Sequence, residues 1–102
     1  MSFLILRDRF LALLTKAQEE RPNKQNWVET PDNKYPEPEW VLYERETMLN
    51  AVNAYRAETG KEPISREKLL QVERSACGHV DYSRKFALYC AELAVDKDVR
   101  IY

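Results

Sequence analysis

The densest group of side chains that could do chemistry lies between residues 77 and 81, where Cys77, His79 and Asp81 alternate with Gly78 and a valine. Thiolate, imidazole and carboxylate groups are all zinc ligands, but structural zinc sites normally use two ligand pairs, each with a gap of roughly two to four residues. The only other cysteine, Cys90, lies in an apolar stretch. We therefore expect no metal and no cofactor, and a small metal-dependent enzyme built on Cys77, His79 and Asp81 is our third hypothesis.

The same residues do not predict a nucleophilic enzyme. A catalytic Cys–His pair needs hydrogen-bond geometry and a third group that orients the base, and nothing in the sequence indicates an oxyanion hole or a strained turn at the nucleophile. We interpret Cys77 and Cys90 as small buried residues. His79 then belongs to a turn between helices, and Asp81 caps the following helix. The expectation is a protein without catalytic residues.

A third charged group, Glu44, Arg45 and Glu46, falls inside an expected helix. The two carboxylates point in directions about 200° apart at about 3.6 residues per turn, so they cannot act on one proton. Arg45 falls near the apolar face of the helix, and a partly buried cation requires a carboxylate partner. The pattern predicts a structural ion pair at Arg45.

Binding to nucleic acid is the alternative hypothesis. The glycine at position 78 separates two expected helices, as in a helix-turn-helix, but Arg74 occupies the place where that motif needs a small residue. The second helix offers Arg84 and Lys85 and then becomes apolar, whereas a recognition helix exposes a polar face to the bases. The whole chain has 16 basic and 17 acidic residues. It therefore lacks the overall positive charge that is typical of duplex-binding domains.

Four aromatic residues, Trp27, Tyr35, Trp40 and Tyr43, cluster around a proline-rich segment. Trp and Tyr are frequent anchors of protein interfaces. Small domains also use them to cover their cores, which is the commoner use. Both interpretations stay open, and these four residues are the candidate partner-binding site.

The elements that must position these residues are mainly helical. With 102 residues, the chain is long enough for one domain, residues 1–102. Apolar residues recur at spacings of three and four, Ser65 is a good N-cap, and Gly60 and Gly78 are placed to end helices. The sequence predicts an all-α fold, a small bundle of about four helices with these ranges: 3–20, 38–59, 66–77 and 81–95.

Residues 22–38 hold four of the five prolines and predict a long ordered loop, held in place by Trp27, Val28 and Tyr35. Its neighbourhood, residues 22–40, carries two basic and four acidic residues. The tail 99–102 alternates and is consistent with an edge strand, a docked extension or a frayed end.

The apolar opening at residues 3–6 is followed by Arg7, Asp8 and Arg9. It is too short for a signal-peptide core or a membrane span. Together with only two cysteines, this predicts a cytoplasmic protein that does not enter a membrane. A homo-oligomer that shares its apolar faces is also compatible with the sequence.

Three stretches carry a resemblance to a known group of proteins: WVLYER at 40–45, GHVDY at 78–82 and KFALYCAEL at 85–93. Together they resemble short accessory proteins of temperate phages and prophages. The resemblance implies a role in binding and redirecting a host enzyme, such as a recombination nuclease or a defence enzyme. Our leading hypothesis is therefore a non-enzymatic protein whose partner is another protein.

Overall fold

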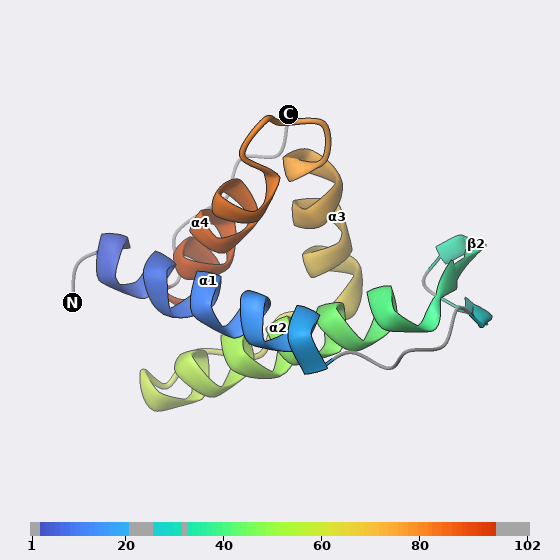
Figure 1. Ribbon diagram of the computed structural model, residues 1–102. Coiled ribbons are helices and arrows are strands. Elements are labelled where there is room, and N and C mark those ends of the chain that lie inside the picture. The colour runs from blue at the N-terminus through green and yellow to red at the C-terminus, as the bar shows by residue number, and fades with distance from the viewer. Residues whose placement is uncertain (1–2, 21–25, 32, 96–102) are drawn as a thin grey trace.

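The computed structural model describes residues 3–20, 26–31 and 33–95, which form four helices and one β-hairpin (Figure 1). The four expected helices are confirmed, with ends within two residues of the predicted ones. The prediction of a purely α fold is wrong, because two strands precede the second helix. The elements are α1 (Phe3–Glu20), β1 (Trp27–Thr30), β2 (Asn33–Pro38), α2 (Glu39–Glu58), α3 (Arg66–Ala76) and α4 (Tyr82–Ala94).

The helix ends follow mostly from local sequence. The Ser65 hydroxyl oxygen accepts a hydrogen bond from the Lys68 N–H at 3.1 Å, as expected for an N-cap. Gly60 and Gly78 have φ angles of +72° and +91°, which residues with a Cβ rarely adopt. Asp81 is the N-cap of α4, as predicted, but its side chain makes no capping hydrogen bond. Its φ and ψ of −102° and 55° lie away from the extended geometry that Ser65 adopts.

The helices bury one face each around a common core. α1 packs against α4 and α2, and α3 packs against α4 (Figure 1). Phe10 of α1 is fully buried, and its ring lies 5.5 Å from the ring of Tyr55 on α2. Each helix thus buries the stripe of apolar residues that its spacing predicts. The largest fully buried side chains are Phe10, Met48, Val52, Leu69, Val72 and Cys90.

The segment expected to be a loop forms an antiparallel hairpin instead. Trp27 pairs with Pro38, Val28 with Glu37 and Thr30 with Asn33. Between the last two pairs, one residue of β1 lies opposite three residues of β2, so the hairpin contains a bulge. Prolines suggested a loop, but edge strands and bulges tolerate them. Residues 21–25, 32 and the tail from 96 lie outside the described residues, and so does the predicted alternation at 99–102.

Candidate functional site

The hairpin carries the most exposed aromatic side chains of the candidate site. Trp27 and Tyr35 are each 67% exposed, and Val28 is 38% exposed. The expectation that these three side chains hold the segment against the core is therefore wrong. The hairpin extends from the start of α2 at one end of the molecule, away from the contact between α1 and α4 (Figure 1). Its apolar groups face the surroundings, where a partner can reach them.

Trp40 and Tyr43 are placed differently from the two hairpin residues. Both lie in the first turns of α2 and are half-buried. Trp40 lines a cavity of about 310 Å³ between the helices. Tyr43 lines a separate groove of about 330 Å³ together with Thr30 of β1 and Arg66 of α3. The structure thus divides the predicted set into an exposed pair on the hairpin and a half-buried pair beside it.

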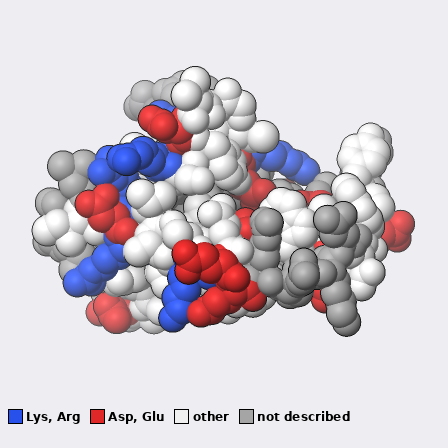
Figure 2. Space-filling view, in the orientation of Figure 1, with Lys and Arg blue, Asp and Glu red and all other residues white. Residues whose placement is uncertain are grey.

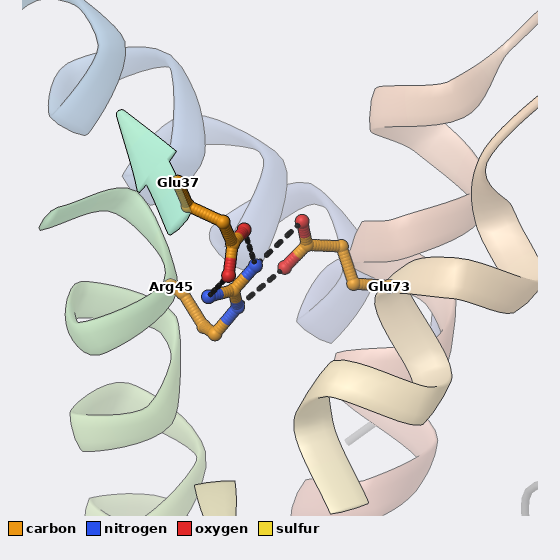
Figure 3. A network of polar contacts seen from close by, with 3 residues as sticks. All are labelled: Glu37, Arg45 and Glu73. Carbon is orange, nitrogen blue, oxygen red and sulfur yellow. Dashed lines mark hydrogen bonds and ion pairs between the residues drawn. The ribbon is translucent and has the colours of Figure 1, made fainter. Parts of the chain in front are cut away.

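The hairpin is tied to the helices by an ion-pair network around Arg45 (Figure 3). Arg45 is 4% exposed and lies between Glu37 of β2 and Glu73 of α3, whose side chains are 16% and 19% exposed. Its Nη1 and Nη2 donate to the two Glu37 oxygens at 2.9 and 2.6 Å. Its Nε and Nη2 donate to Glu73 at 2.9 and 3.2 Å. The predicted ion pair is confirmed, and it holds three elements together.

The electrostatics of this network favour the charged guanidinium. Burial by itself lowers the pKa of Arg45, but the hydrogen bonds and negative charges of Glu37 and Glu73 outweigh burial and raise the pKa above its ordinary value. Each carboxylate binds in the two-pronged geometry that Arg prefers. Because Arg45 has no proton to give at any physiological pH, it acts as a structural anchor and not as an acid or base.

Arg84 and Lys85, the residues of the nucleic-acid hypothesis, lie on α4, on the opposite side of the molecule from the hairpin (Figure 1). Arg84 is exposed, and Lys85 is half-buried with its Nζ 5.4 Å from the centre of the Tyr89 ring. Both line a shallow groove of about 580 Å³ with Arg7 of α1 and His79. Asp81 also lines it. The groove therefore has a modest positive charge, while the opposite face of α4, with Phe86 and Cys90, packs into the core.

Cys77, His79 and Asp81 lie in the turn between α3 and α4. Within the described ranges, no three His, Cys, Asp or Glu residues come together as a metal-binding group. A ring nitrogen of His79 lies 3.1 Å from the Ser75 carbonyl oxygen. Cys90 is buried as predicted, whereas Cys77 is exposed, so the expectation of burial is wrong for Cys77. The turn after Ala76 leaves it outside the packed face of α3.

Burial also shifts the pKa of two groups on α4, the buried Cys90 and the half-buried Tyr82. It raises the pKa of the Cys90 thiol well above its ordinary value, and nearby Glu73 adds to the shift. Burial similarly raises the pKa of the Tyr82 hydroxyl, with a further contribution from Glu73. Both groups stay protonated at neutral pH. A thiol in this state is a poor nucleophile.

Comparison of the chain with protein-family models, curated proteins and solved structures found no match. Among the residues that the structure describes, no helix combines the length and apolar character needed to cross a membrane.

Sequence reasoning missed two parts of this site. It predicted that Arg45 needs a carboxylate but not which one, because Glu37 and Glu73 are 8 and 28 residues away. It also missed the strands, since proline content dominated the interpretation of residues 22–38. The signal for a strand was the presence of Trp27, Val28 and Thr30 within four residues, because these residue types favour strands.

Proposed function

We propose that this protein is a non-enzymatic interaction protein that binds another protein through its hairpin and the adjoining start of α2. One observation carries the proposal: Trp27, Val28 and Tyr35 are all exposed on one hairpin, which Arg45 fixes to the helices. Exposed apolar groups on an element that is fixed to the rest of the fold are a common form of binding surface. Trp40 and Tyr43, half-buried next to the hairpin, extend this surface.

The partner that we infer is a host protein. The resemblance to accessory proteins of temperate phages and prophages supports a factor that works in the cytoplasm of a bacterial host and modulates a host enzyme, such as a recombination nuclease or a defence enzyme. Binding a partner by aromatic anchors requires no catalytic group, cofactor or metal, which agrees with a structural role for Arg45 and with the protonated state of Cys90.

The test is capture of the partner from host extract by the immobilised protein, followed by mass spectrometry and measurement of the dissociation constant. Trp27→Ala and Tyr35→Ala should each weaken binding about thirtyfold, as expected for interface anchors. Their melting temperatures should stay within about 3 °C of the wild type. Val80→Ala is the matched control, because Val80 is fully exposed in the turn before α4. Partner binding that survives both hairpin substitutions would contradict the proposal.

A second candidate function is nucleic-acid binding by Arg84 and Lys85. The observation that favours it is the groove in which these residues meet Arg7. Binding of duplex or single-stranded DNA should then weaken steeply as salt rises, because phosphate contacts release counterions. Replacing Arg84 and Lys85 by Gln should weaken it equally for all sequences. Absence of binding at low salt, or binding that is independent of salt, removes this candidate.

A further inference from the structure

The outer edge of β1 is the side of the strand that faces away from β2, and one hydrogen bond shows which main-chain groups lie on it. The Glu39 N–H donates to the Asn26 carbonyl oxygen at 2.8 Å. In an antiparallel ladder this bond flanks a pair that is not itself hydrogen-bonded, here Trp27 and Pro38. The main-chain N–H and C=O of Trp27 therefore point away from β2. The alternation along β1 directs the main-chain groups of Glu29 to the same edge.

The outer edge of β2 cannot offer the same groups. Pro38 occupies the position equivalent to Trp27, and Pro36 lies two residues before it. Neither residue has an N–H, so a further strand along β2 would lack donors at both positions. Prolines on an edge strand are a common protection against unwanted strand pairing.

β1 has no proline. Its sequence, WVET, contains neither proline nor a basic residue, and its first three residues are exposed. In the part of the chain that the structure describes, the sheet has these two strands alone. A two-stranded sheet gains stability from a third strand. The hairpin thus has one closed edge and one edge that is open to pairing.

We propose that β1 accepts an extended segment of the partner protein as a third strand of this sheet. This inference rests on the proposed function and specifies how the partner binds. Main-chain hydrogen bonds to Trp27 and Glu29 would supply the pairing, and side-chain neighbours would supply specificity. Trp27 and Glu29 are two residues apart and so share a face of the strand.

The chemistry of β1 defines the segment that fits it. The residue next to Trp27 is apolar or aromatic, because such cross-strand pairs are favourable. In the partner strand, the residue that lies next to Glu29 is two positions from the one next to Trp27, and it is Lys or Arg. On the face shown in Figure 2, the described residues at the hairpin end include acidic groups but no basic ones. A partner strand with a basic residue complements this charge.

A second copy of this chain is a poorer occupant for the same reason. Pairing β1 with itself would add a second Glu29 to the sheet, because the β1 strand of each copy carries this acidic residue and no basic one. Like charges across a strand pair are destabilising. Concentration-dependent dimerisation through β1, measured by sedimentation, would overturn the inference of a foreign partner.

The decisive variant is Glu29→Pro, with Glu29→Ala as its matched control. Both remove the carboxylate, but only proline removes the outward N–H, and it leaves Trp27 and Tyr35 in place. Proline at 29 also suits the strand, because the residue before a proline prefers extended backbone. Circular dichroism and melting temperature should be alike for the two variants, since neither touches the helical core.

The probe is a phage-displayed library of random peptides of about ten residues, the usual upper length of a strand. Selected peptides should carry the apolar and basic residues two positions apart. They should bind Glu29→Pro about tenfold more weakly than Glu29→Ala, as expected for a lost main-chain hydrogen bond. Hydrogen exchange of the wild-type protein should show new protection of the Trp27 and Glu29 amides on binding. Equal binding of the peptides to the two variants would overturn strand addition, and so would Trp27 and Glu29 amides that gain no protection. Strand addition would also fall if the library yielded no peptide whose binding depends on the hairpin.

This experiment separates the two proposals. If Trp27→Ala weakens binding of the captured host protein and Glu29→Pro does not differ from Glu29→Ala, the interaction surface stands and strand addition falls. If Trp27→Ala and Tyr35→Ala both bind the host protein as the wild type does, the proposed function itself falls.

Discussion

The helical body and the hairpin use apolar side chains in opposite ways. In the body, Phe10 and Met48 are fully buried, and the helices gain their stability from covering such residues. In the hairpin, Trp27 and Tyr35 are two-thirds exposed and contribute little to a core. The hairpin keeps its place through polar contacts instead, above all those of Glu37 with Arg45. The difference teaches that stability and recognition are divided between two regions of one small domain.

This division means that substitutions in the two regions should affect different measurements. Changes in the body should lower the free energy of unfolding, and changes on the hairpin should alter binding. Arg45 joins the regions, so its substitution should affect both.

The largest expected effect is in the body. Phe10→Ala should lower the free energy of unfolding by about 3–5 kcal/mol, because it removes a fully buried ring and leaves a cavity beside Tyr55. Urea denaturation followed by far-ultraviolet circular dichroism measures the change. Ile5→Ala is the control, since Ile5 lies in the same helix and is 53% exposed. Equal losses for the two variants would contradict the assignment of the buried face.

The next effect tests the link between the regions. Arg45→Met should cost about 2–3 kcal/mol, somewhat below the loss for a fully buried pair, because Glu37 and Glu73 keep some exposure to water. The substitution leaves the carboxylates of Glu37 and Glu73 facing each other without a cation. The triple variant Glu37→Gln, Arg45→Met, Glu73→Gln removes all three charges and should recover much of the loss.

Hydrogen exchange gives the regional measurement for Arg45→Met. Exchange of the hairpin amides should accelerate more than exchange in the middle of α4. Unchanged hairpin exchange would show that the network does not hold the hairpin in place.

A further effect, smaller for each pH unit, concerns alkaline pH and the body alone. Burial raises the pKa of Cys90 and of Tyr82 above the ordinary values of 9.0 and 10.0. Above those values the unfolded chain releases protons that the folded chain retains, so stability falls as pH rises. The slope approaches about 1.4 kcal/mol per pH unit for the fully buried Cys90 and is smaller for Tyr82, which is only half-buried. Below pH 8 neither group should contribute to a pH dependence.

Variants separate the two groups in denaturation curves between pH 8 and 11. Cys90→Ala should flatten the loss that begins near pH 9, and Tyr82→Phe the loss that begins near pH 10. Cys77→Ala is the control, because Cys77 is exposed. An alkaline limb that is the same in Cys90→Ala and in the wild type would contradict the assigned burial.

The smallest effect on stability is expected at the hairpin. Trp27→Ala should change the free energy of unfolding by no more than about 0.5 kcal/mol, as is usual for exposed positions. A thermal melt compared with that of Phe10→Ala checks this. A loss of several kcal/mol would show that Trp27 packs into the fold, and the contrast between the two regions would disappear.

The sequence by itself determined the helices of this protein. Spacing of apolar residues fixed which faces are buried, and Ser65, Gly60 and Gly78 fixed helix ends, because these features depend on residues within one or two turns. It also determined that Arg45 needs a carboxylate, since a buried cation without a partner is costly in any fold.

Only the tertiary structure decided the remaining features. The choice of Glu37 and Glu73 as partners, the pairing of β1 with β2, and the exposure of Trp27 depend on how distant segments pack together. Local propensity does not encode such contacts, and a proline-rich strand resembles a loop until its partner is known. The open edge of β1 follows from the same pairing, because the register decides which main-chain groups point outward.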